Sequence, residues 1–215
     1  DKHRQVDDES YGGGPGMVLK AEPLRLAMQD AMRRLPAARR ILLAADGEPV
    51  RQGKVAELAR DSQLILVAGR YEGVDERFVE ASVDESLSVG DVVLSGGELP
   101  ALMVIDAVAR LLPGTLGDAE SAVQESFTDG LLDWPHYTRP ENWEGRPVPP
   151  VLLGGNHAEI DRWRRKQALG RTWQRRPDLL AGRELSMEER RLLDEYLAEQ
   201  DATRTGASDA TIARR

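Results

Sequence analysis

Cysteine is absent from the 215-residue chain. This absence excludes disulfide bonds, a thiol nucleophile and cysteine-ligated zinc, and it agrees with a reducing compartment. The chain also lacks apolar runs near the roughly 20 residues that cross a bilayer. Its start, DKHRQVDDES, has no apolar signal-peptide core. We therefore expect no membrane partner and a cytoplasmic location.

Histidine is scarce, and basic residues are outnumbered. The three histidines, His3, His136 and His157, lack the spacing of metal ligands, so no metal site is predicted from them. With 29 basic and 37 acidic residues, the net charge is −8. This balance argues against a protein that simply coats nucleic acid, but it leaves room for a local basic patch.

One stretch reverses the overall charge. Residues 160–183 hold eight basic and two acidic side chains, a local net of +6, together with Trp163 and Trp173. Clustered arginine with interleaved aromatics is typical of phosphate contact and base stacking. A solvated helix face would show the same charge run, and that alternative stays open.

The apolar pattern predicts an α/β fold. Continuous apolar runs predict strands over 41–45, 64–68 and 92–94, with a turn at Asp46-Gly47 after the first. Helical spacing predicts helices over 23–35, 55–60, 74–81 and 98–112. The expected inner face of the last comprises Leu99, Leu102, Met103, Ile105, Ala109 and Leu112. Strands that are apolar on both faces and alternate with helices predict a parallel sheet covered on both sides.

The composition changes in the second half. Residues 131–150 contain five prolines, as in a linker or an extended segment that wraps a ligand. Helices are predicted over 156–169 and 187–199, the latter begun by Ser186 as N-cap with Glu189 three residues on. Residues 201–215 lack apolar periodicity, and we expect them to be disordered.

Three loops are rich in glycine: YGGGPGM (11–17), GRYEGVDER (69–77) and SVGDVVLSGGELP (88–100). None fits a dinucleotide or phosphate-loop motif. Turn geometry explains each alone, whereas three in one small domain indicate backbone close to a ligand at the carboxyl ends of strands. Glu72, Arg110 and Glu125 lie near these loops. A carboxylate near an arginine is typical either of a general base beside a charge stabiliser or of a surface ion pair.

Long segments resemble the bacterial tRNA (guanine(37)-N1)-methyltransferases. They are DDESYGGGPGM, LILVAGRYEGVDER, SVGDVVLSGGELPALMVIDAVARLLPG, SFTDGLLDWPHYTRP, GRPVPPVLLGGNHAEIDRWRRKQALGRTW and RRPDLL, within about Val6 to Leu180. The resemblance implies the SPOUT superfamily fold, an α/β parallel sheet with a deep C-terminal trefoil knot, plus a small all-helical C-terminal domain. No topology argument from sequence would choose a knot. It also implies a homodimer with each active site at the subunit interface.

The same resemblance implies the ligands and site residues. The methyl donor would be S-adenosylmethionine, and the family's reaction is described as magnesium-assisted. The base would be Glu125, with Arg110 stabilising charge on the guanine and Glu72 nearby. The anticodon arm of tRNA would contact His136, Arg162, Arg165, Lys166 and Arg171. The cofactor would contact Leu43, Gly69, Tyr71, Ser88, Val89, Gly90, Asp91, Val92, Val93, Leu94, Gly96, Gly97 and Pro100.

The implied organisation is a knotted cofactor domain over 1–120, a linker over 121–150, a helical tRNA-binding domain over 151–200 and a tail over 201–215. The sequence departs from the family pattern at several positions. Glu125 replaces an aspartate, Trp134 replaces a small residue, and 44–47 read Ala-Ala-Asp-Gly. The family's first strand, a helix and another strand would precede Asp7, and we expect a sheet without them to expose an apolar edge. A non-catalytic tRNA-binding relative remains the alternative.

Overall fold

The computed structural model describes residues 5–115 and 125–212, with side chains described up to residue 202. The chain divides into two compact units, unit 1 (Asp1–Ala119) and unit 2 (Glu120–Arg215). The helices within the described residues include none with the length and apolar character of a membrane span.

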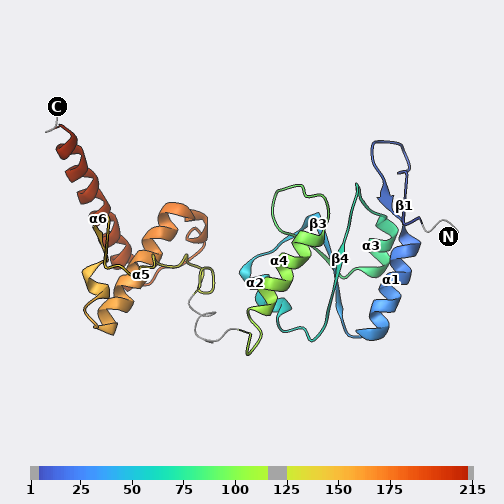
Figure 1. Ribbon diagram of the computed structural model, residues 1–215, viewed down its shortest axis with the longest axis horizontal. Coiled ribbons are helices and arrows are strands. Elements are labelled where there is room, and N and C mark those ends of the chain that lie inside the picture. Colours follow the sequence, from blue (N-terminus) through green and yellow to red (C-terminus); the bar gives the residue numbers. More distant parts are fainter. Residues whose placement is uncertain (1–4, 116–124, 213–215) are drawn as a thin grey trace. The chain divides into compact units, whose positions relative to one another are not determined.

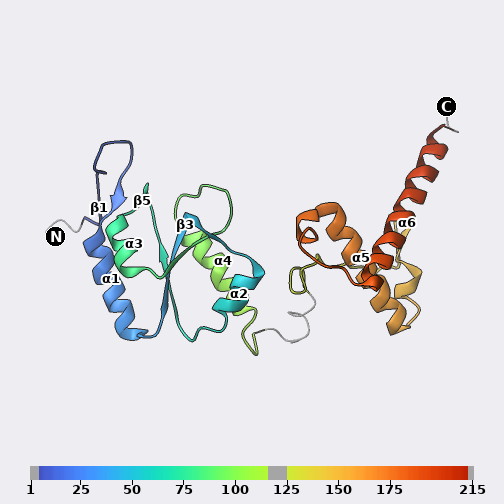
Figure 2. The same cartoon turned by 180° about the vertical axis from the view of Figure 1, so that it is seen from behind.

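Unit 1 is an α/β unit built on a parallel sheet. The strand order is β4 (Leu64–Ala68), β3 (Arg39–Pro49), β6 (Glu85–Ser88), and both pairings are parallel. Helices α1 (Ala21–Arg34) and α3 (Glu76–Ser82) lie on one side of the sheet, and α2 (Gln52–Leu58) and α4 (Glu98–Ala109) on the other (Figures 1 and 2). The predicted parallel sheet with helices on both sides is confirmed. The short strands β1 (Asp7–Asp8), β2 (Val18–Leu19) and β5 (Gly73–Val74) form a second sheet.

The core of unit 1 lies where the sheet meets α2 and α4. Its buried members are Ile41, Leu43, Val55, Leu58, Leu87, Val104 and Val108. Leu42 and Phe78 are buried as well. The near-continuous apolar strands therefore reflect burial of the sheet on both faces, as in other parallel sheets.

Two strand predictions are wrong. The turn expected at Asp46-Gly47 is absent, because β3 continues to Pro49 after a register shift between Leu43 and Glu48. A Cβ on Gly47 would lie 2.5 Å from the Leu87 backbone nitrogen, so glycine permits this close approach. The third strand is β6, not residues 92–94. The apolar run there misled the prediction, since Val93 is 95% exposed, whereas polar Glu85–Ser88 pairs with β3.

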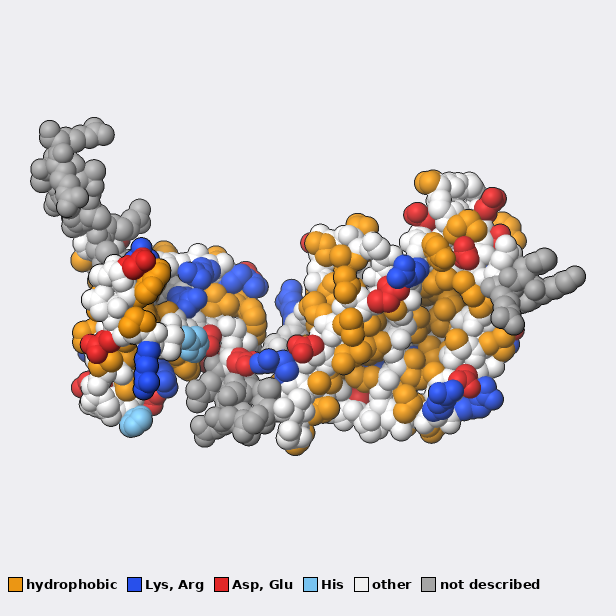
Figure 3. Space-filling view, viewed as in Figure 1, with side chains coloured by type: hydrophobic (Ala, Val, Ile, Leu, Met, Phe, Trp, Pro, Cys, Tyr) orange, Lys and Arg blue, Asp and Glu red, His pale blue; other side chains and the backbone are white. Residues whose placement is uncertain are grey.

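The predicted inner face of α4 is also wrong. Pro100, Val104 and Val108 point inward and are buried, whereas Leu99 is 66% and Leu102 60% exposed. The helix is apolar on both faces, so spacing alone could not select the buried one. Hydrophobic side chains accordingly gather on the surface over α4 (Figure 3).

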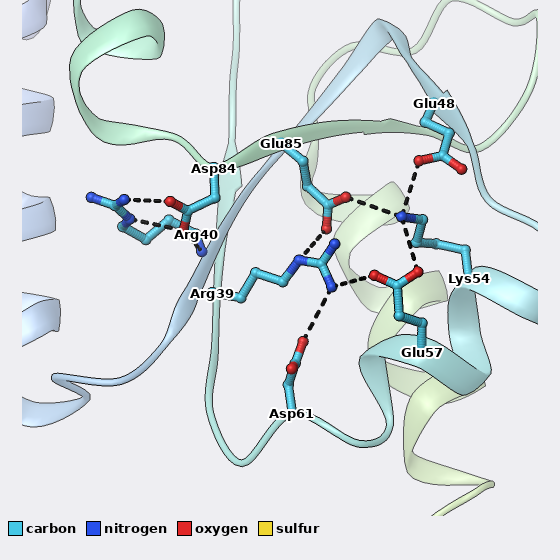
Figure 4. A network of polar contacts seen from close by, with 8 residues as sticks. All are labelled: Arg39, Arg40, Glu48, Lys54, Glu57, Asp61, Asp84 and Glu85. Carbon is cyan, nitrogen blue, oxygen red and sulfur yellow. Dashed lines mark hydrogen bonds and ion pairs between the residues drawn. The ribbon is translucent and has the colours of Figure 1, made fainter.

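A network of ion pairs ties together the beginnings of the strands (Figure 4). Arg39, the first residue of β3, pairs with Glu57, Asp61 and Glu85 at 2.6, 3.4 and 2.7 Å. Lys54 lies within 3.3 Å of carboxylate oxygens of Glu48, Glu57 and Glu85, and these carboxylates raise its pKa. Arg39 and Glu85 begin their strands, whereas Glu48 is the second-last residue of β3, so the network extends from the strand beginnings toward the end of β3.

Unit 2 begins its regular structure with a hairpin of β7 (Asn142–Trp143) and β8 (Arg146–Pro147), followed by η1 (Pro150–Leu152). Helix α5 (His157–Arg175) packs on α6 (Met187–Ile212), with η2 (Pro177–Leu179) between them in the chain. The core comprises Leu131, Ala168, Leu169 and Leu192.

Both predicted helices of unit 2 exist but are longer than expected. The predicted N-cap is confirmed, since Glu189 N donates to Ser186 Oγ at 3.1 Å and Ser186 N donates to Glu189 Oε2 at 2.8 Å. Helix α6 continues through Ile212, over a stretch where we expected no regular structure. Residues 121–124 of the expected linker and 213–215 of the expected tail lie outside the described residues.

Candidate functional site

A cavity of about 500 Å³ opens where β3, β4 and β6 end. Such a volume is within the range of roughly 300–1,000 Å³ that small-molecule sites occupy. Every residue predicted to contact the cofactor lines it except Asp91. The cavity also has lining residues that were not predicted to contact the cofactor: Leu42, Ala44, Ala45, Asp46, Arg70, Glu72, Gly73, Val74, Glu76, Val79, Ser86 and Leu87.

Glycines bring backbone together at one wall of the cavity. Gly97, the N-cap of α4, donates its backbone N–H to Gly69 O at 2.8 Å, and Arg70 and Gly96 form an isolated β-bridge. A Cβ on Gly97 would lie 2.8 Å from Ala68 Cα and 3.0 Å from Gly69 N. Because both are backbone atoms, no side-chain rotation would relieve the clash. The third glycine loop is therefore required for chain packing at the cavity wall.

Two further turns shape the cavity. Ser88 is buried, and its Oγ accepts from Gly90 N and donates to Gly90 O, both at 3.2 Å. Gly90 has φ +136°, a backbone conformation that side-chain-bearing residues rarely adopt. Tyr71 adopts φ 61° and is 57% exposed. A strained tyrosine at a cavity is the kind of outlier that clusters at ligand sites.

Glu72 joins the first glycine loop to the cavity. Its backbone nitrogen donates to Met17 O at 2.9 Å, and a Cβ on Gly16 would lie 2.3 Å from its Oε1. The side chain of Glu72 is exposed. Nearby, Arg70 Nε donates to Glu98 Oε1 at 2.5 Å, and this bond lowers the pKa of Glu98. Arg70 and Glu72 thus line the cavity, and Arg70 is paired with the Glu98 carboxylate.

Glu125 lies in unit 2, on the edge of a second cavity of about 360 Å³. The lining includes three more carboxylates, Asp129, Asp133 and Asp161, and the stacked pair Trp134 and Arg164, whose guanidinium carbon is 4.9 Å from the ring centroid. The sequence analysis identified Glu125 but missed the other acidic residues. The sequence spacing could have indicated two of them, because Glu125, Asp129 and Asp133 lie four residues apart.

The segment that carries Glu125 is held by hydrogen bonds within unit 2. Asp133 N donates to Ser126 Oγ at 2.9 Å, and Leu132 N donates to the hydroxyl of fully buried Thr172 at 2.9 Å. The Asp133 carboxylate contacts His136 Nε2 at 2.8 Å. The backbone following Glu125 is therefore anchored to α5.

The structure pairs most of the cations expected to contact tRNA with carboxylates. Arg162 contacts Glu195 at 2.7 Å, and Lys166 contacts Glu199 at 2.5 Å. Arg165 pairs with Asp129 and, at 2.6 Å, with Glu189. Arg171 is half-buried on α5, and Arg110 is the half-buried C-cap of α4. Charge counting along the sequence could not detect these partners, because several of them come from α6.

Among the described residues, no group of three or more histidine, aspartate or glutamate side chains has an arrangement that would hold a metal ion. The described residues therefore offer no ligand set for the magnesium that the resemblance implies.

Known proteins resemble this chain closely. A family described as tRNA (Guanine-1)-methyltransferase TrmD matches residues 1–182. A tRNA (guanine-N(1)-)-methyltransferase of Stutzerimonas stutzeri is 60% identical over 94% of this chain and 81% of its own length. The same-named proteins of Alcanivorax borkumensis and Chromohalobacter salexigens are each 59% identical, over 97% and 93% of this chain and 81% and 78% of their own lengths. With most of the chain matched at this identity, the protein belongs to the tRNA (guanine-1)-methyltransferase family.

Proposed function

We propose that this chain is an enzyme that transfers a methyl group from S-adenosylmethionine to nitrogen 1 of guanosine 37, the nucleotide 3′ to the tRNA anticodon. The observation that carries the proposal is the cavity at the strand ends of a chain about 60% identical to tRNA (guanine-N(1)-)-methyltransferases. The lining fits S-adenosylmethionine, because it combines apolar side chains with glycine backbone that a bound ligand can approach.

The chemistry needs a base and a stabiliser of negative charge. S-adenosylmethionine supplies an electrophilic methyl group on sulfonium sulfur. Glu125 would accept the proton from guanine N1, whose lone pair then forms the new N–C bond as the S–C bond breaks. Arg110 would stabilise the negative charge that develops on the exocyclic oxygen of guanine. Glu72 would help to position the guanine ring. The longer side chain of Glu125 reaches one methylene further than the family aspartate.

We propose a homodimer with each active site at the subunit interface and the SPOUT trefoil knot in unit 1. The exposed apolar face of α4 supports the dimer. Leu99, Leu102, Met103 and Ile105 are each 48–66% exposed there, and Val92 and Val93 are exposed nearby in the chain. Contiguous exposed apolar surface of this kind marks association sites. Sedimentation equilibrium of the whole chain would measure the stoichiometry.

We propose that unit 2 binds the anticodon arm, through His136, Arg162, Arg165, Lys166 and Arg171. Three of these cations would have to exchange carboxylate partners for phosphates. Charge-removing variants should then weaken binding to all tRNAs and reduce the salt dependence. If the variants show the same dependence of tRNA affinity on salt as wild type, the proposed phosphate contacts are refuted. A protein that acts on tRNA would work in the cytoplasm.

The decisive experiment is methyl transfer to tRNA carrying guanosine 37, with 1-methylguanosine identified by mass spectrometry. Glu125→Gln should lower kcat on the order of 10²- to 10⁴-fold while leaving cofactor and tRNA affinities unchanged. Glu125→Asp, which restores the family residue, is the matched control and should retain activity. Absence of 1-methylguanosine from the wild-type chain with cofactor bound would favour the non-catalytic tRNA-binding relative.

A further inference from the structure

The β7–β8 hairpin displays a tryptophan at the surface of unit 2. Trp143 is 55% exposed and lies directly opposite Arg146 in the antiparallel pair. The guanidinium carbon of Arg146 is 5.4 Å from the centroid of the Trp143 ring. Arg146 is exposed and forms no ion pair with another described residue. A large aromatic surface and an uncommitted cation are thus presented together.

Trp143 and Arg146 stand on either side of a strained turn. The two turn residues, Glu144 and Gly145, have φ of 51° and 79°, as in a type I′ turn. Glycine accepts such a conformation readily, but glutamate does not. Gly145 N donates to Asn142 Oδ1 at 2.9 Å, and Val148 N donates to Glu141 O at 2.8 Å. Strain retained in a short surface hairpin is typical of a segment that presents residues for binding.

The charges of the hairpin favour stacking over a purely electrostatic contact. Glu141 immediately precedes β7 and Glu144 stands in the turn, so the positive charge of Arg146 belongs to a hairpin that also carries acidic residues. Arg162 and Lys166 of α5, by contrast, are paired with carboxylates of α6. The hairpin suits an unstacked nucleotide, because the Trp143 ring supplies a surface on which the base can stack and Arg146 supplies a contact to one phosphate.

We propose that Trp143 and Arg146 form a contact for a single-stranded part of the tRNA substrate, with a base stacked on Trp143 and its phosphate at Arg146. The inference rests on the proposed function for the identity of the RNA. The hairpin contact is additional to the residues named above for the anticodon arm. It assigns to β7–β8 a role in binding substrate and none in the chemical step.

The test measures tRNA affinity as a function of salt for whole-chain variants. Trp143→Ala should raise the Kd on the order of 5- to 100-fold, the range for loss of one base stack, with little change in salt slope. Trp143→Phe keeps an aromatic face and should recover most of the affinity. Arg146→Gln should instead lower the salt slope by about one phosphate contact. Leu153→Ala is the control, since Leu153 is 53% exposed in the same unit but cannot stack.

Kinetics separate this inference from the proposed function. Trp143→Ala should raise the KM for tRNA by a similar factor and leave kcat at saturating tRNA unchanged. Wild-type affinity in Trp143→Ala would overturn the inference even if 1-methylguanosine forms normally. If Trp143→Ala binds tRNA more weakly than wild type, but the wild-type chain forms no 1-methylguanosine, the hairpin contact is supported and the methyl transfer is refuted.

Discussion

Gly170 permits the close packing of α5 on α6, and its replacement by alanine should destabilise unit 2. A Cβ at this position would lie 2.3–2.4 Å from three ring atoms of Tyr196, whereas ordinary contact begins at 3.4 Å, so the ring would have to move by about 1.1 Å. Tyr196 is only 5% exposed, and its hydroxyl donates to Gln174 Oε1 at 3.1 Å. The ring therefore cannot move away without disturbing the helix pair.

Three contributions to the free energy of unfolding set the size of the expected destabilisation. Alanine is favoured over glycine inside a helix by about 1 kcal/mol. Overpacking a buried site costs about 1–3 kcal/mol, and losing the tyrosine hydrogen bond costs about 1 kcal/mol more. We expect a net destabilisation of roughly 1–3 kcal/mol. At about 4–8 °C per kcal/mol for a unit of this size, Tm should fall by roughly 5–20 °C.

Tryptophan fluorescence is the suitable assay, because all four tryptophans of the chain lie in unit 2. Gly53→Ala in α2 is the matched control, and its Tm is followed by circular dichroism because unit 1, which holds α2, has no tryptophan. A Cβ there meets nothing within 4 Å, so the same substitution should be neutral or stabilise by up to about 1 kcal/mol. In a Tyr196→Ala background, Gly170→Ala should no longer destabilise. A Tm for Gly170→Ala at or above the wild-type value would refute the packing argument.

Two further predictions concern acid stability and the cofactor cavity. Burial raises the pKa of Glu189, but the hydrogen bonds from Ser186 N, Arg183 and Arg165 outweigh it and lower the pKa from 4.5 to about 2. The stabilisation, on the order of 3 kcal/mol, is complete above pH 4.5 and is lost as the pH falls toward 2. Glu189→Gln should therefore lose less stability than wild type between pH 5 and pH 2 in thermal melts, and parallel curves would contradict this. Gly97→Ala places a Cβ 2.8 Å from Ala68 Cα, so S-adenosylmethionine affinity by calorimetry should fall about tenfold or more. An unchanged Kd would contradict the role of that glycine, and Gly53→Ala again serves as control.

Several elements of both units were predictable from local pattern. Strand β4 matches the predicted range 64–68, since a continuous apolar run bounded by glycine is a local feature. The capping pair of Ser186 and Glu189 depends on residues three apart, and it is confirmed. The glycine loops were recognised as a group, and two of them, 69–77 and 88–100, line one cavity because parallel strands end on the same edge of a sheet.

Other features depended on contacts between distant segments. Strand β6 is polar in sequence and exists because it pairs with β3, whereas the apolar residues 92–94 form no strand. Arg162 and Lys166 stand in a basic run, yet α6 supplies their carboxylate partners, 33 residues away in each case. The stacking of Arg146 on Trp143 needed the turn between them.

Periodicity and motifs that are contiguous in the chain were enough to predict the α/β class, the family, the order of helices and two of the loops that line the cavity. The buried face of α4, by contrast, depends on packing in the folded chain. Both faces are apolar, and packing against the sheet selected Val104 and Val108 and left Leu99 and Leu102 exposed. The same holds for the charges of α5, since an ion pair requires two segments to be placed side by side.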